Sequence, residues 1–84
     1  MSQYYFTFRS VTAAMQGQKR LNDAAIRATM VRTPTSLRKQ GCGYSLYVSE
    51  EAYPGAEAIL SHEEKKYQKC YRRTAEGQWQ EVQI

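Results

Sequence analysis

The order in which strand-like and helix-like hydrophobic patterns follow one another is the feature that most constrains the fold. A short alternating segment comes first, a pattern of helical period follows, and two further alternating segments come next. A second helical pattern then precedes a final alternating segment. The order is therefore strand, helix, strand, strand, helix, strand. The expected ranges are 4–8, 11 to about 26, 28–32, 44–48, 49 or 54 to about 62, and 67–73.

Local signals support these boundaries. Ser10 can cap the first helix, and Pro34 ends the second strand because it has no amide hydrogen for a ladder. The second helix is expected to start at Ser49 or, if its proline occupies the first turn, near Pro54. The apolar positions expected to face the core are Val11, Ala14, Met15, Leu21, Ala24 and Ala25 in the first helix and Ala52, Ala56, Ile59 and Leu60 in the second.

This order of elements predicts an α+β fold of the ferredoxin-like kind, a split β-α-β-β-α-β sandwich. Both helices would cover one face of an antiparallel sheet with strand order 4-1-3-2. The dipeptide Glu76-Gly77 is a turn signal, so 79–84 is expected to add a C-terminal hairpin strand. With 84 residues, the chain should form one domain over 1–84, with a core at 4–66 and a C-terminal strand and hairpin at 67–84.

Composition limits the functional classes. The net charge of +4 allows an anionic partner, but the basic residues are spread along the chain rather than gathered in one arm. Neither a secretory signal nor an apolar run long enough to span a bilayer is visible, which predicts a cytoplasmic protein with no membrane partner. The two cysteines are then expected to be reduced thiols.

Cys42 is the residue with the most informative surroundings. It stands between Gly41 and Gly43 in the segment KQGCGYSL, residues 39–46. The flanking glycines leave space for a partner to approach the sulfur, but they also suit a helix cap and a strand start around a small apolar filler. Both interpretations remain open at this point.

The expected fold favours ionisation of Cys42. The third strand runs antiparallel to the first, so its start should lie beside the opening of the first helix, near Ser10 and Thr12. Unpaired amide hydrogens at a helix N-terminus stabilise an anion, and Arg38 and Lys39 would add positive charge. A thiolate is the reactive form of cysteine.

The segment TPTSLRKQGCGYSLYV, residues 33–48, resembles a small bacterial family, long treated as a domain of unknown function, that is named for a role in carrying selenium or sulfur. Thr33-Pro34 and Cys42-Gly43 match the family's pattern in order and separation. The Ser/Thr turn that opens the first helix also fits it. The resemblance covers about residues 4–62.

The resemblance implies that Cys42 carries sulfur or selenium as a persulfide or selenopersulfide. Its partners would then be donor and acceptor proteins, and no cofactor or metal would be needed. The chain is accordingly expected to be a carrier or accessory protein rather than a stand-alone enzyme. Its single Asp and single His allow no Ser/His/Asp set to be assembled. A homodimer is compatible with this role.

Two other candidate residues are expected to be structural. Cys70 lies in the fourth strand, separated from the third by the first, which places it too far from Cys42 for a disulfide. A resolving thiol is the alternative for Cys70. His62, at the end of the second helix, has no metal-binding spacing to the cysteines.

Two rival functions are kept open. The same order of elements occurs in RNA-recognition domains, and Tyr5 and Tyr47 would point outward from the sheet. Nucleic acid is nevertheless the less favoured partner, because Cys42 occupies one expected stacking position and Tyr44 faces the core. The other rival is a protein-interaction domain that uses a sheet edge or Trp79 and has no chemistry at Cys42.

Overall fold

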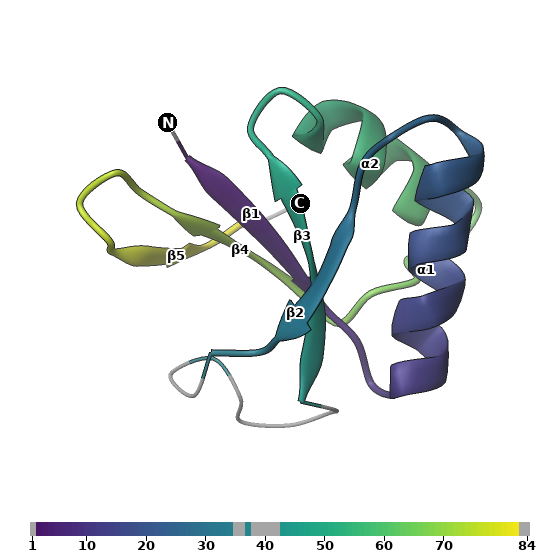
Figure 1. Cartoon of the computed structure of the whole chain (residues 1–84), viewed down its shortest axis with the longest axis horizontal. Coiled ribbons are helices and arrows are strands. Elements are labelled where there is room, and N and C mark those ends of the chain that lie inside the picture. Colours follow the sequence, from purple (N-terminus) through teal and green to yellow (C-terminus); the bar gives the residue numbers. More distant parts are fainter. Residues whose placement is uncertain (1, 35–36, 38–42, 83–84) are drawn as a thin grey trace.

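The structure of the protein is a computed structural model that describes residues 2–34, 37 and 43–82. Five strands and two helices follow the expected order along the chain (Figure 1). Their bounds are β1 (Gln3–Thr7), α1 (Val11–Asp23), β2 (Thr29–Arg32), β3 (Tyr44–Ser49), α2 (Tyr53–Leu60), β4 (Lys69–Arg73) and β5 (Trp79–Glu81).

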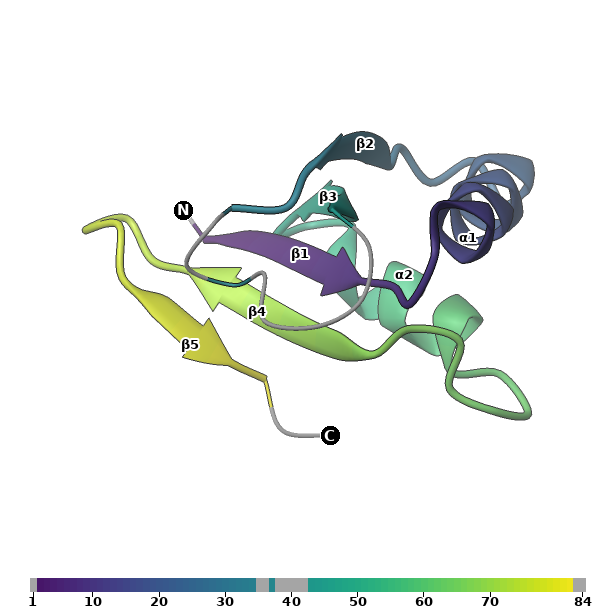
Figure 2. The same cartoon turned by 90° about the horizontal axis from the view of Figure 1, so that it is seen from below.

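The strands form one antiparallel sheet in the order β2-β3-β1-β4-β5. Both helices lie on the same side of this sheet (Figures 1 and 2). The predicted ferredoxin-like sandwich and its 4-1-3-2 strand order are therefore confirmed, with β5 as the added C-terminal strand. In the register of the sheet, Phe6 stands between Leu46 of β3 and Cys70 of β4.

Alternate residues of β1, β3 and β4 face the helices and supply the strand part of the core. Phe6, Leu46 and Val48 are completely buried there, and the ring of Tyr4 stacks on that of Tyr53 from α2 at a centroid distance of 4.0 Å. The buried core consists of Phe6, Phe8, Ala14, Leu21, Ala28, Leu46, Val48, Ala56, Leu60, Tyr67 and Cys70. We call the helix side of the sheet the covered face and the opposite side the open face.

The buried side of α1 differs from the expected one. Ala14 and Leu21 are buried as predicted, but Val11 is 40% and Met15 56% exposed, and Gly17 lies against the sheet instead. A Cβ atom at Gly17 would stand only 3.0 Å from Cζ of Phe8, so the absence of a side chain allows the close approach. A bulky ring beneath a glycine thus fixes which side of α1 is buried.

The helix also ends earlier than predicted. Ala25 has a left-handed backbone with φ of 63°, and the amide of Ile26 donates to the carbonyl of Leu21 at 2.8 Å. This pattern of a left-handed residue and a bond back across the last turn is a Schellman-type ending. Ala24 and Ala25, expected in the apolar stripe, are exposed for this reason.

Other boundaries shift by a few residues. α2 begins at Tyr53 with Pro54 in its first turn, which confirms the later of the two predicted starts. Its expected stripe is correct, since Ala56 and Leu60 are buried and Ala52 and Ile59 pack against the core. β4 begins at Lys69 rather than at residue 67, and β5 ends at Glu81, although the amide of the next residue, Val82, still donates to the carbonyl of Cys70 at 2.8 Å. Within the described residues, no helix is both long enough and apolar enough to cross a bilayer.

Candidate functional site

Thr33 and Gly43, one residue from each dipeptide of the sequence motif, meet at one end of the sheet. β2 and β3 pair as far as Arg32 opposite Tyr44, and the amide of Thr33 then donates to the carbonyl of Gly43 at 2.7 Å. The chain leaves the sheet at Pro34, which cannot extend the ladder. The base of the 34–42 segment is therefore tied together by the residues that flank it.

The candidate site residues Arg38, Lys39, Gly41 and Cys42 lie outside the described residues. Leu37 is buried, and its amide donates to the carbonyl of Pro34 at 2.9 Å. It does not belong to the core beneath the helices.

Three buried hydroxyl groups stand at the same end of the sheet. Thr33 and Ser45 are 3% and 0% exposed, and their hydroxyl oxygens are 2.6 Å apart in a hydrogen bond. The hydroxyl of Thr7, opposite Ser45 on β1, accepts from the amide of Lys69 at 3.1 Å. These are the buried polar side chains of the described part of the chain. We call Thr7, Thr33 and Ser45 the hydroxyl end of the open face.

Ser45 directly precedes Leu46, a core residue of β3, so alternation along the strand directs Ser45 away from the covered face. The structure places it on the open face, as alternation requires, yet completely buried. Thr33 was noticed only as part of a motif. Three hydroxyl residues spaced along neighbouring strands were a weak signal for this cluster, since their pairing depends on a register that the sequence does not show.

The start of α1 is positioned largely as predicted. Thr7, the last residue of β1, pairs with Ser45, so the chain enters α1 at the end of the sheet where β3 begins (Figure 1). Ser10 is the N-cap, and its hydroxyl accepts from the amide of Ala13 at 3.1 Å. Thr12 is exposed in the first turn. The fold therefore brings Ser10, Thr12 and Gly43 to one end of the sheet.

Cys70 lies in a very different place. It is 1% exposed on the covered face of β4, opposite Phe6. Burial, with a smaller contribution from the Glu57 carboxylate, raises the pKa of the Cys70 thiol to about 12. Because only the thiolate is nucleophilic, Cys70 is unreactive at neutral pH in the folded chain.

A cavity of about 480 Å³ opens beside Cys70 between the end of α2 and the strands β4 and β5. Tyr67 and Ser61 contribute to its wall, and the Ser61 hydroxyl donates to the Glu57 carboxylate at 2.6 Å. The buried hydroxyl of Tyr67 makes no hydrogen bond within the described part of the chain. Burial raises the pKa of Tyr67, so the ring stays neutral.

His62 occupies the surface position expected for it. Its side chain is 78% exposed, and its nearest carboxylate oxygen, from Glu63, is 3.7 Å away. Over the ranges that the structure describes, no group of three or more His, Cys, Asp or Glu side chains is arranged to hold a metal ion.

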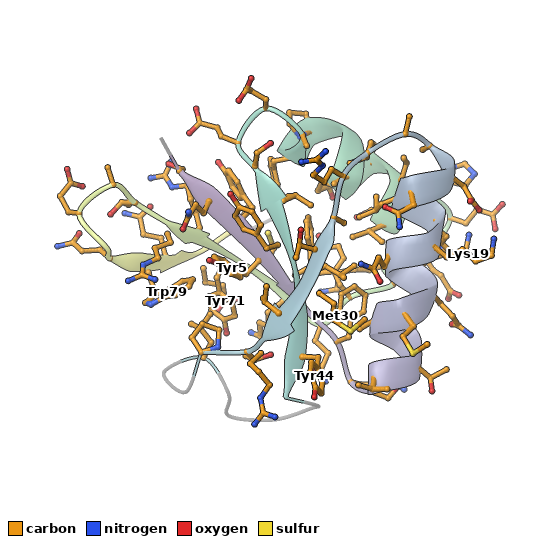
Figure 3. The ribbon with its side chains drawn as sticks, in the orientation of Figure 1. Tyr5, Lys19, Met30, Tyr44, Tyr71 and Trp79 are labelled. Carbon is orange, nitrogen blue, oxygen red and sulfur yellow. The ribbon has the colours of Figure 1, made fainter. Side chains whose placement is uncertain are left out.

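The open face also carries an aromatic surface, formed by Tyr5, Tyr47, Tyr71 and Trp79. Tyr5 of β1 pairs with Tyr47 of β3 and with Tyr71 of β4, and Trp79 of β5 pairs with Arg73. Tyr5, Tyr71 and Trp79 gather on the side away from the helices (Figure 3). The sequence indicated Tyr5 and Tyr47, whereas Tyr71 and Trp79 join them only through the sheet register.

Tyr44 was expected to face the core. It does lie on the covered side of β3, but at the edge of the core, where it is half-buried and the Arg32 guanidinium stands 5.5 Å from its ring centroid. The aromatic surface is therefore built without Tyr44.

Comparison with known proteins gives one match. The family profile described as "Putative Se/S carrier protein-like" matches residues 3–72, which include Thr33-Pro34, Cys42-Gly43 and all of β1 to β3. The match continues into β4, further than the resemblance seen in the motif segment. No curated protein and no solved structure matches the chain.

Proposed function

The chain belongs to the Se/S carrier-like family, and from this premise we propose that Cys42 carries a sulfur or selenium atom between two partner proteins. The carrier thiol would be Cys42, with Gly41 and Gly43 giving access to it. Ser10 and Thr12 at the start of α1, together with Arg38 and Lys39, would favour its thiolate.

The observation that carries the proposal is the contrast between the two cysteines. Cys70 is buried on the covered face, and the pKa of its thiol is raised to about 12. Cys42 directly precedes Gly43 in the chain. Gly43 is half-buried at the sheet end where α1 begins, outside the helix-covered core. If a thiol of this chain takes part in exchange at neutral pH, Cys42 is therefore the candidate.

The two residues that flank the 34–42 segment are held firmly in the sheet. The amide of Thr33 binds the carbonyl of Gly43, and the hydroxyl pair of Thr33 and Ser45 is buried beneath. A buried hydrogen bond is costly to break without replacement, which holds the two ends of the segment together.

The proposed transfer is a thiol exchange. The Cys42 thiolate attacks the terminal sulfur of a donor persulfide, a sulfur–sulfur bond forms to Cys42, and the donor leaves as its own thiolate. Delivery is the same step in reverse order, with an acceptor thiolate as the nucleophile. The selenium form would exchange a terminal selenium atom in the same way. Neither step needs a metal or an organic cofactor.

The partners are a donor and an acceptor protein, and the reducing cytoplasm is the compartment in which both thiols stay free. A homodimer would be compatible with these steps and is not required by them. Because the reaction is stoichiometric, we propose a carrier or accessory protein rather than an enzyme that turns over alone.

Mass spectrometry after incubation with a small-molecule persulfide donor tests the proposal. The wild-type chain and Cys70→Ala should each gain one sulfur atom, and Cys42→Ser should gain none. Cys70→Ala is the matched control, because alanine leaves no unpaired hydroxyl at a buried position.

The rate of alkylation gives a second, independent readout. Cys42 should react faster at neutral pH than free cysteine, whose pKa is about 8.5. Alkylation of Cys42 no faster than that of free cysteine, together with no gain of sulfur or selenium, would show that the proposed carrier role is wrong.

A further inference from the structure

No helix or strand of the described part of the chain covers the aromatic surface on the open face. Its four rings come from four adjacent strands of one sheet, and all of them are half-buried rather than sealed. The core, by contrast, completely buries Phe6, only one residue from Tyr5. Ring surface is therefore left accessible on the open face.

The rings are held in a defined arrangement. The centroid of Tyr5 lies 5.4 Å from that of Tyr47 and 5.1 Å from that of Trp79, with the Trp79 ring nearly edge-on at 65°. Tyr71 stands beside Tyr5 in the register of β1 and β4. Such tilted contacts stabilise the positions of the rings without covering all of their faces.

Arg73 adds a positive charge to this surface. Its guanidinium carbon lies 5.1 Å from the centroid of the Trp79 ring. The side chain is exposed and forms no ion pair with a carboxylate of the described residues. Lys69, on the same face, is by comparison neutralised by Glu81 at 3.1 Å. The aromatic surface therefore presents one cation whose charge is left for an external anion.

From this combination we propose that the aromatic surface, together with Arg73, binds single-stranded RNA. Unpaired bases offer flat faces that stack on tyrosine and tryptophan rings, and each linking phosphate supplies the anion that Arg73 lacks. The net charge of +4 favours the approach of such a strand. The tyrosine hydroxyls can hydrogen-bond to ribose 2′-hydroxyls, which DNA does not have.

This site is separate from the carrier thiol. It rests on β1, β3, β4 and β5 alone and does not require any chemistry at Cys42. The sequence left nucleic acid as a less favoured partner because Cys42 occupies one expected stacking position and Tyr44 was expected to face the core, with only Tyr5 and Tyr47 left as outward aromatics. Tyr71, Trp79 and the unpaired Arg73 are the structural observations that change this balance.

Trp79 provides the readout, because it is the only tryptophan of the chain. The full chain is titrated with an oligouridine strand of about eight nucleotides, a length typical of one binding fold. Stacking should quench Trp79 fluorescence, and the affinity should fall between about 50 and 200 mM salt as phosphate contacts are screened.

Three variants test the contacts. Tyr47→Ala should weaken binding roughly 5- to 150-fold, as expected for loss of one stacked base. Arg73→Gln, at an exposed position that should not affect folding, should lower the slope of log affinity against log salt by about 0.7. Arg20→Gln is the matched control, since it removes the same charge from an exposed position in the last turn of α1.

Four outcomes would overturn the proposal. The first is no quenching at the lower salt concentration, and the second is an equal loss of affinity in Arg73→Gln and Arg20→Gln. The third is equal binding of an oligothymidine DNA strand of the same length, which contradicts recognition of RNA. The fourth is tighter binding of an acidic, tyrosine-containing peptide, which would make the surface a protein-docking site. Because carrier activity is measured by mass at Cys42, either proposal can fail without the other.

Discussion

The two faces of the sheet place neighbouring residues of one strand in opposite surroundings. On β1, Phe6 is completely buried beneath the helices, whereas Tyr5 lies on the open face beside Tyr47 and Trp79. Both residues are aromatic and both have aromatic neighbours. The comparison shows that an aromatic ring on the covered face packs into the core, whereas a ring on the open face leaves part of its surface accessible. The face of the sheet, rather than the residue type, decides between these two roles.

The largest effect is expected from truncating the covered face. Phe6→Ala removes a ring that packs against Tyr67 at 4.8 Å, and it should lower the free energy of unfolding by about 3–5 kcal/mol. Tyr5→Ala, one residue away, should cost less than half as much, because its ring is only half-buried. Urea denaturation of both variants measures the difference. Equal losses of unfolding free energy in the two variants would contradict the distinction between the covered and the open face.

The hydroxyl end lies on the open face but is buried, so substitutions there should lower the free energy of unfolding. Thr33→Val leaves the Ser45 hydroxyl without its partner and should cost about 1–3 kcal/mol. Adding Ser45→Ala to Thr33→Val should recover part of that loss, because no unpaired hydroxyl then remains. A double-mutant cycle from denaturation curves gives the coupling between the two residues. Simple additivity would contradict the hydrogen bond.

Alkaline pH should test the covered face through Cys70. Its pKa is about 12 in the folded chain and about 8.5 in the unfolded chain, so above pH 8.5 the folded state binds more protons. Stability from this group is therefore complete below about pH 8.5 and is lost as the pH rises toward 12. The slope should reach at most about 1.4 kcal/mol per pH unit.

Cys70→Ala should flatten the pH dependence between about pH 8.5 and 9.5, before Tyr5, Tyr53 and Tyr67, whose pKa values are raised in the folded chain, reach their unfolded pKa of about 10. Thermal denaturation of wild type and variant over that range provides the measurement. The same dependence of stability on pH in both proteins would mean that the pKa of the Cys70 thiol is not raised by burial.

The smallest effect concerns two glycines that face different neighbours. Gly17→Ala places a methyl group 3.0 Å from Cζ of Phe8 and 3.3 Å from Cδ1 of Leu46, so crowding should exceed the helical preference for alanine. We expect a net loss of about 1 kcal/mol. Gly55→Ala meets only the end of the Ile26 side chain and should be neutral or slightly stabilising. Their order in melting temperature tests how tightly α1 packs on the covered face.

Much of this fold is visible in local patterns of the sequence. The alternation of Tyr4, Phe6 and Phe8 identifies the covered side of β1, and Pro34 correctly ends β2. The end of α1 was missed because an alanine, rather than a glycine, adopts the left-handed turn at residue 25. The burial of Gly17 could not be foreseen either, since it depends on which ring of the sheet lies beneath the helix.

The candidate site was predictable to a different degree. Its motif pointed to Thr33 and Gly43, and the structure joins them through a hydrogen bond. The hydroxyl partner Ser45 and the outward neighbours Tyr71 and Trp79 depend on the pairing of distant strands, which periodicity does not report. The residue types are visible in the sequence, but the strand register that brings these residues together is not.

The hydrogen bond between Thr33 and Gly43 also affects which sequence changes this chain can accept during evolution. The sheet closes at this pair, so the stretch between them is attached at two points already held together. The entropic cost of such a closed stretch grows only with the logarithm of its length. Outside the buried Leu37, insertions, deletions and substitutions within it should therefore have little effect on the sandwich, and selection can adjust the chemistry of this stretch while the rest of the chain maintains the fold.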